Sequence, residues 1–139
     1  AHQIVHSRLF GILIAAASAQ QIVLSAPLDV RVGENTVVQP DLMVIHDVDR
    51  HGSEVTEPPV LAVEILSPSS RRTDLVRKPE VLGLFGVEHY WVVDPQHPAI
   101  RAFQLVGDTY ESRQIVEGAD LFDTEVPFPV SFRPADLAR

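Results

Sequence analysis

The sequence predicts a single α+β domain, in which helices flank a mixed β-sheet. Three observations indicate this class: apolar residues at helical spacing near the N-terminus, short aliphatic runs typical of buried strands, and a second helical pattern between two of those runs. Aliphatic residues are plentiful and aromatic residues are few, which suits a sheet with packed helices. With 139 residues the chain makes one domain, residues 1–139, and leaves no room for a second.

Charge and composition narrow the class of protein. The chain has a formal net charge of −8 and no cysteine. The acidic balance excludes a protein that coats nucleic acid by bulk attraction, because non-specific affinity comes mainly from Lys and Arg neutralising phosphates. Without cysteine, neither a disulfide framework nor a thiolate zinc site can form, which is compatible with the cytoplasm. The longest apolar run, residues 9–17, is half of the roughly 20 residues that a bilayer crossing needs, so we expect a soluble, cytoplasmic protein.

The first predicted element is an amphipathic helix from His2 to about Ala19. His2 and His6 lie four residues apart and therefore share a face of this helix. We interpret them as a solvated pair; the alternatives are a zinc site, or a contact between His2 and the carboxylate site described below. Because the chain opens with Ala1 directly before the helical pattern, we expect part of the N-terminal sequence to be missing.

Strands follow the first helix. The predicted ones are residues 21–26, 28–32 and 36–45. The last of them is aliphatic and carries Asp41 directly after Pro40. The polar segment 46–57 is expected to be a mobile loop, which could close over a substrate or serve only as a connection.

The most informative strand carries one carboxylate. Prolines close the aliphatic run 60–66 at both ends, which predicts a buried strand with Glu64 set into it. An ionised carboxylate in an apolar layer costs several kcal/mol unless a cation or several donors meet it. Glu64 therefore either belongs to a functional site, or its carboxylate reaches water at the end of the strand. Asp41 favours a site, because two neighbouring strands would each bring a carboxylate to one place, and such a pair suits a hard cation such as Mg²⁺.

A second helix is predicted to follow Ser67 and to end at Gly86. Its predicted buried side consists of Leu75, Val76, Leu82 and Phe85. Pro79 predicts a kink, or a short first turn and a restart of the helix near the proline. A basic patch, opposed only by Asp74, lies at the start of this segment and consists of Arg71, Arg72, Arg77 and Lys78.

The last third of the chain is predicted to be mainly β-structure. Residues 89–94 form a near-continuous apolar strand, at the end of which Asp94 caps a turn. Residues 100–105 and 109–116 form a hairpin around Gly107. The remaining segment is a closing flap, and its packing residues are Phe122, Phe128 and Phe132.

Five motifs occur in a fixed order: Pro40-Asp41, residues 63–68, Asp74 with Lys78, Gly86-Val87, and residues 90–95. Over roughly residues 2–105 this series resembles the bacterial restriction-endonuclease-like family of the PD-(D/E)XK nuclease superfamily. The resemblance implies a restriction-endonuclease-like fold and metal-dependent hydrolysis of a phosphodiester. Members of the family usually carry more sequence before the equivalent of His2, including an acid on the first helix.

The resemblance also implies roles for single residues. Asp41 would be the acid of the PD motif and Glu64 the acid of the second motif. Both would bind Mg²⁺, or Mn²⁺, with the backbone oxygen of Ile65 as a third ligand. The lysine of the superfamily is expected at the position of Leu66, and Lys78 on the following helix is the implied substitute, which orients or helps deprotonate the attacking water.

Each residue that neighbours the implied catalytic residues has two interpretations. The three arginines of the basic patch would hold flanking phosphates, or they form a solvated helix face. Asp74 would orient Lys78 or cap the helix. Ser67 would support the site or simply end the strand.

Three functions are consistent with the sequence. The first is an Mg²⁺-dependent endonuclease that acts on DNA. The second is a non-catalytic domain that keeps the fold and works through protein contacts, such as a homodimer; the acidic charge and Leu66 in the lysine position support it. The third is a mononuclear zinc site built on His2 and His6.

Overall fold

The fold is built on one central sheet. The computed structural model describes residues 2–68 and 71–139, with residues 71–75 as backbone only. Within this part of the chain the central sheet has six strands in the order β1-β4-β5-β6-β7-β8, of which β5 and β6 are parallel and the other neighbours antiparallel. The strands are β1 (Gln21–Ser25), β4 (Leu42–His46), β5 (Leu61–Ile65), β6 (His89–Asp94), β7 (Ala99–Val106) and β8 (Thr109–Glu117).

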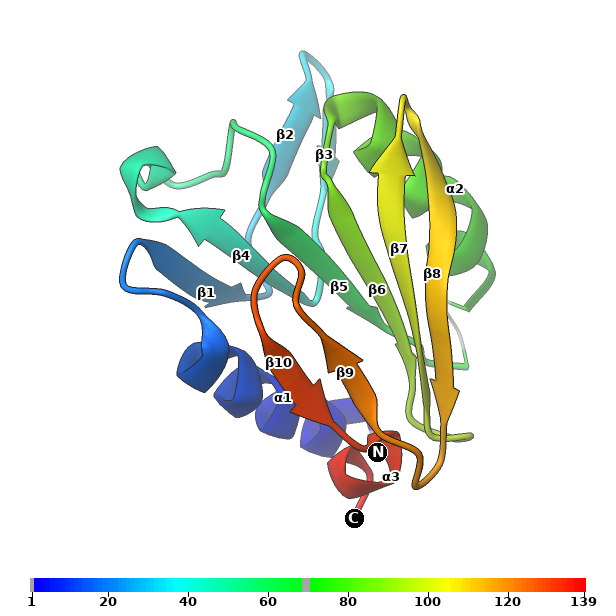
Figure 1. The fold of residues 1–139 in the computed structure, drawn as a ribbon. Helices are drawn as coiled ribbons and strands as arrows, with labels where there is room; N and C mark the ends of the chain where they lie inside the picture. The colour runs from blue at the N-terminus through cyan, green and yellow to red at the C-terminus, as the bar shows by residue number, and fades with distance from the viewer. Residues whose placement is uncertain (1, 69–70) are drawn as a thin grey trace.

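Two hairpins and the helices complete the domain. The hairpins are β2 (Val30–Gly33) with β3 (Thr36–Val38), and β9 (Phe122–Thr124) with β10 (Val130–Phe132). The helices are α1 (His2–Ala16), α2 (Arg71–Phe85), α3 (Pro134–Leu137) and the 3₁₀-helix η1 (Asp47–Asp49). Helix α1 and the β9–β10 hairpin lie on one face of the sheet, and α2 lies on the other (Figure 1). The mixed α/β architecture predicted from the sequence is confirmed.

The larger core lies between α1, the C-terminal hairpin and the sheet. Val5, Leu9 and Leu13 recur at helical spacing, and all three are buried. Trp91 of β6 packs edge-on against Phe122, with ring centroids 5.2 Å apart. The predicted packing of the C-terminal phenylalanines on the core is confirmed, since Phe122, Phe128 and Phe132 are all buried.

The second core lies between α2 and the opposite face of the sheet. Leu82 of α2 is buried against Tyr90 and Val92 of β6. A close approach brings α2 to the β7–β8 turn: a Cβ added to Gly83 would lie 2.7 Å from the backbone oxygen of Asp108. Only glycine therefore allows this approach, which places α2 over the strands that lead to the candidate site.

The predicted strand over residues 36–45 is wrong, because it is two strands. Residues 39–41 separate β3 from β4, so Asp41 stands just before β4 instead of inside a strand. Proline has no amide hydrogen to donate to a ladder, and Pro40 interrupts the pairing here. The first helix also ends at Ala16, three residues before the predicted end.

The segment 46–57 is held in place instead of forming a free loop. It begins with η1, and Val55 is buried. The backbone of Val55 accepts from the Arg31 amide and donates to Asp29 oxygen, at 2.8 Å each. These bonds attach the segment to β2 at Val55, so it is not a free connection along its whole length.

Helix α2 runs through Pro79 as one helix, so of the two predicted alternatives, a kink or a restart near the proline, the restart is wrong. Its packing face is set by Leu82 and Phe85, as predicted, whereas Val76 is 65% exposed and was wrongly assigned to the buried side. The side chain of Leu75 lies outside the described part of the structure. Within the described residues, no helix is long and apolar enough to cross a membrane.

A buried histidine makes the stability of the domain depend on pH. His89, at the start of β6, is 6% exposed, and burial lowers the pKa of its imidazole below the ordinary 6.5, against a smaller opposite effect of Glu88. The unfolded chain therefore binds more protons in mildly acidic solution than the folded chain does. We predict that the free energy of unfolding falls as the pH drops through about 6.5, and that His89→Gln loses this part of the dependence. Urea unfolding at about pH 7.5 and about pH 5.5 measures both; parallel pH profiles of the two proteins would contradict the prediction.

Candidate functional site

Asp41 connects the start of β4 to the end of β5. Pro40 is buried and places Asp41 immediately before β4. The Ile65 amide donates a hydrogen bond of 2.7 Å to Asp41 Oδ2. The antiparallel register pairs Leu42 with Val63, which places Asp41 beside Glu64 in the next position. The two carboxylates therefore belong to adjacent ends of two hydrogen-bonded strands.

Glu64 is buried and is met by a cation. Its side chain is 1% exposed, so the interpretation of a strand-end head group in water is wrong. Lys78 Nζ from α2 lies 3.0 Å from Glu64 Oε2, in a hydrogen-bonded ion pair, and the lysine side chain is 24% exposed. The pair crosses from the helix to the strand, because α2 packs directly over this face of β5. Leu66, at the position where the superfamily carries lysine, is buried instead in the core under α2.

The N-terminal helix brings two histidines to the same region. His2 Nε2 lies 3.6 Å from Asp41 Oδ2, so His2 does reach the carboxylate site. His6 Nε2 lies 3.2 Å from the Asp41 backbone oxygen and 3.1 Å from Ser25 Oγ, and the imidazole rings of His2 and His6 are stacked at 6.5 Å. The predicted solvated pair is therefore wrong for His6, whose ring nitrogen joins α1 to the ends of β1 and β4.

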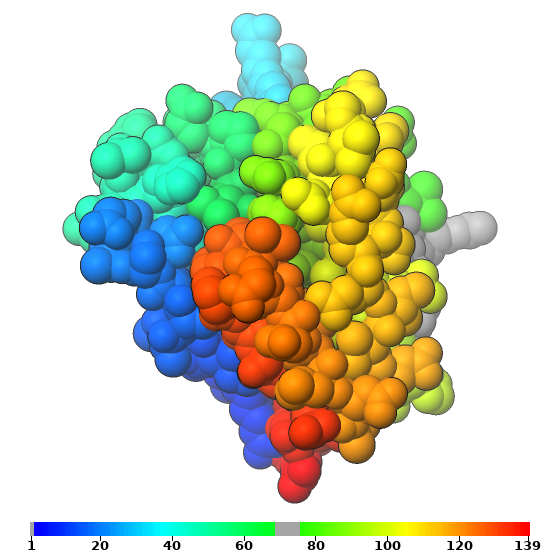
Figure 2. Space-filling view, in the orientation of Figure 1, coloured from blue at the N-terminus to red at the C-terminus, as the bar shows by residue number. Residues whose placement is uncertain are grey.

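The basic patch is described only in part. Arg77 is exposed and, with Lys78 and Val81, lines a cavity of about 430 Å³ between α2 and residues 36–39. The β2–β3 hairpin that forms the other wall stands out from the body of the molecule, with its turn in cyan (Figure 2). The side chains of Arg71, Arg72 and Asp74 lie outside the described part of the structure.

Ser67 and Asp94 lie near the ends of the two parallel strands, β5 and β6. Ser67 follows the end of β5 by two positions. Asp94 ends β6 and caps a turn, as predicted, because its Oδ1 accepts from the amides of Gln96 and His97 at 3.0 and 3.3 Å.

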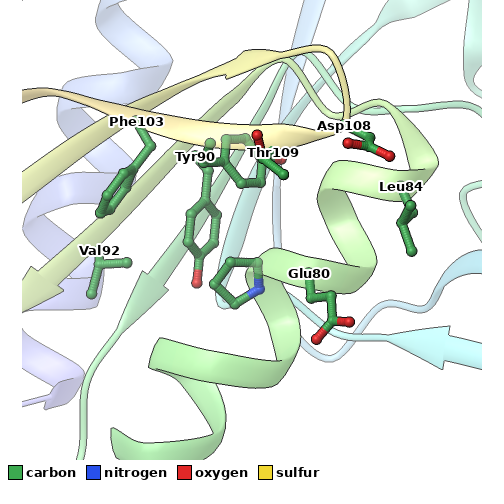
Figure 3. Close-up of a pocket in the computed structure, with 9 residues that line it drawn as sticks. Glu80, Leu84, Tyr90, Val92, Phe103, Asp108 and Thr109 are labelled. Atoms are coloured by element: carbon green, nitrogen blue, oxygen red, sulfur yellow. The ribbon is translucent and has the colours of Figure 1, made fainter.

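An apolar cavity of about 460 Å³ lies between α2 and strands β6–β8. Figure 3 shows the lining residues Glu80 and Leu84 on the helix, and Phe103 and Tyr90 on the strands. The cavity reaches Val92, which is the cross-strand neighbour of Glu64. This cavity could not be predicted from local sequence patterns, because its walls come from four separate elements.

The donor set suits a hard cation with few protein ligands. Among the described residues, no three histidine, cysteine, aspartate or glutamate side chains gather as a metal site. Mg²⁺ is commonly bound by one or two carboxylates and keeps several waters. Asp41 and Glu64 fit that chemistry.

Comparison with known proteins identifies the family. The family model described as "Uma2: Putative restriction endonuclease" matches residues 1–138. The chain belongs to the Uma2 family. This membership confirms the resemblance drawn from the ordered motifs.

A solved structure shares the Uma2 fold. The chain is similar to the crystal structure of a putative nuclease belonging to DUF820 from Anabaena variabilis ATCC 29413, with a TM-score of 0.73 and 16% sequence identity. The alignment covers 99% of this chain and 79% of that one. At this identity the match shows the fold. The comparison with curated proteins gives no match.

The ion pair across this Uma2 domain predicts a measurable stability effect. Lys78→Met should destabilise the fold by about 2 kcal/mol, because it withdraws the ammonium from a buried carboxylate; the partial exposure of Lys78 keeps the cost below that of a fully buried pair. Arg77→Met, one residue away and exposed, should change stability by less than about 0.5 kcal/mol. Denaturant unfolding compares the two variants.

A double variant separates the charge from the packing. Glu64→Gln combined with Lys78→Met removes both charges, and it should be more stable than Lys78→Met alone. If Lys78→Met and Arg77→Met unfold at the same denaturant concentration, the ion pair contributes nothing to the fold.

Proposed function

We propose that the chain is an Mg²⁺-dependent endonuclease that hydrolyses phosphodiester bonds in DNA. Its family supports nuclease chemistry in general. The observation that carries the proposal further is the 2.7 Å bond from the Ile65 amide to Asp41, which holds one carboxylate at the backbone directly after Glu64. Two oxygen-donor side chains on rigid strand ends are what a catalytic divalent cation requires.

The chain's own residues would hold the ion. Asp41 and Glu64 would supply carboxylate oxygens, and Ile65 its backbone oxygen; Mn²⁺ suits the same donors. When bound, a divalent ion lowers the pKa of a coordinated water and offsets negative charge on the phosphoryl oxygens.

Lys78 would act on the attacking water. Its ammonium carries three donors, and one of them already meets Glu64 Oε2. In this position the lysine would orient the water and offset the charge that develops on the phosphate. The location on α2 explains how Lys78 could serve where the strand itself carries Leu66.

Other residues would position the substrate and the acids. Arg77 is exposed beside Lys78 and would hold a flanking phosphate, together with Arg71 and Arg72. His2 lies beside Asp41 and would keep its carboxylate oriented. Asp74 and Ser67 would support Lys78 and the end of β5.

A second candidate function is a non-catalytic domain that acts through protein contacts, such as a homodimer. Leu66 favours it, because this residue stands in the core at the position of the superfamily lysine. The ion pair of Lys78 with Glu64 favours the enzyme, because it returns an ammonium to that carboxylate.

Cleavage of DNA tests the proposal. Glu64→Gln keeps the shape of the side chain and removes its charge, so it should abolish Mg²⁺-dependent nicking of plasmid DNA. Glu80→Gln, an exposed carboxylate on α2, is the matched control and should nick as the wild type does. Undiminished nicking by Glu64→Gln would refute the proposed role.

Metal binding separates the two candidate functions. Calorimetric titration of the wild-type chain with Mg²⁺ or Mn²⁺ should give a saturating binding signal at millimolar metal, and the Asp41→Asn and Glu64→Gln variants should lose it. A flat titration of the wild type would favour the non-catalytic domain.

A further inference from the structure

We propose that Arg101 binds a DNA phosphate next to the one that is cleaved, so that the substrate strand crosses the sheet from Glu64 towards β7. The inference rests on the proposed nuclease function and names a substrate contact outside the basic patch. It is carried by strand register, by a cavity and by the absence of a partner for this guanidinium.

Strand register places Arg101 in line with Glu64. Glu64 pairs with Val92 across β5 and β6, Val92 pairs with Arg101 across β6 and β7, and Arg101 pairs with Ile115 across β8. Residues that pair directly project from the same face of a sheet. Two strand spacings of about 4.8 Å put the backbone of Arg101 about 10 Å from that of Glu64. One side chain, that of Val92, stands between them.

A cavity opens over this row. It has a volume of about 550 Å³, and its lining includes Leu66, Val92, Arg101 and Ile115. Leu66 directly follows Ile65, and Val92 neighbours Glu64, so the cavity adjoins the candidate site. Among the described residues that line it, Arg101 is the one lysine or arginine.

Arg101 is exposed, and its guanidinium has no partner among the described residues. Within the described part of the chain it makes no hydrogen bond or ion pair, whereas Arg31 is bonded to Glu54 and Arg113 to Glu111. This is notable because Asp94, Glu117 and Asp120 line the same cavity as Arg101. A guanidinium with no hydrogen bond or ion pair to the described residues keeps its donors available to a phosphate, which it can bind with two parallel hydrogen bonds.

The neighbouring rows limit where a phosphate can lie. On one side, the row of Asp94, Ala99 and Glu117 carries two carboxylates. On the other side, the row of Tyr90 and Phe103 is aromatic and lines the apolar cavity under α2. Between these two rows, Val92 lies in line between Arg101 and Glu64. Exposed Ile115, next to Arg101 on the far side, adds an apolar surface for a sugar or base.

The salt dependence of DNA binding tests the contact. We would measure fluorescence anisotropy of a labelled duplex with Ca²⁺ in place of Mg²⁺, comparing Arg101→Gln with Arg113→Gln. Both variants remove one positive charge, but Arg113 is already bonded to Glu111 and Gln104 and lines none of the cavity. Arg101→Gln should weaken binding about tenfold and reduce the slope of log affinity against log salt by about 0.9. Arg113→Gln should bind as the wild type does.

A third variant separates a phosphate contact from a loss of structure. Arg101→Lys keeps the charge without the planar fork, so it should keep the salt slope and recover part of the affinity. Equal affinities and slopes for Arg101→Gln and Arg113→Gln, with a wild type that cleaves DNA, would overturn this inference alone. A wild type that neither binds nor cleaves DNA would overturn the proposed function with it.

Discussion

The hydrogen bond from the Ile65 amide to Asp41 joins the ends of β4 and β5 at the point where the sheet presents its carboxylates. A hydrogen bond to a charged group contributes about 1.5–3 kcal/mol, and this one replaces a ladder contact beyond the last paired residues of the two strands. Asp41 directly precedes β4, and its backbone oxygen accepts a hydrogen bond of 3.0 Å from the Ala26 amide next to β1, so the acid sits on backbone that the sheet itself holds. Glu64 is thus held within a strand, and Asp41 is held against the ends of two strands by backbone hydrogen bonds.

Glu64 adds a second constraint, because it is a carboxylate in a nearly closed layer. Its burial would be unfavourable without a cation, and α2 delivers Lys78 to within 3.0 Å of it. The helix reaches that place because Gly83 lets it approach the β7–β8 turn closely and Leu82 fills the space above β6. The packing of α2 and the electrostatics of the site thus depend on each other.

Much of this arrangement follows from the sequence, because the signals are local. The run 60–66 between prolines predicts β5 with its buried acid, and the pattern of residues 89–94 predicts β6 to the residue. Contacts between residues that are far apart in the sequence give no such signal. His6 meets Asp41 across 35 positions, and the segment 46–57 is fixed by Val55 pairing with β2, so neither contact could be predicted from periodicity. Arg101 likewise looks like an ordinary polar residue of a strand until the register aligns it with Glu64. The helix through Pro79 shows tertiary packing overriding a local preference.

The central claim is that Asp41 and Glu64 grip one divalent ion. Crystals of the chain soaked in Mn²⁺, with anomalous diffraction recorded near the manganese edge, test it most directly. The account predicts one strong anomalous peak within about 2.2 Å of an oxygen from each carboxylate, close to the backbone oxygen of Ile65. An empty map at those two side chains, or a peak bound elsewhere while Lys78 still covers Glu64, would contradict it.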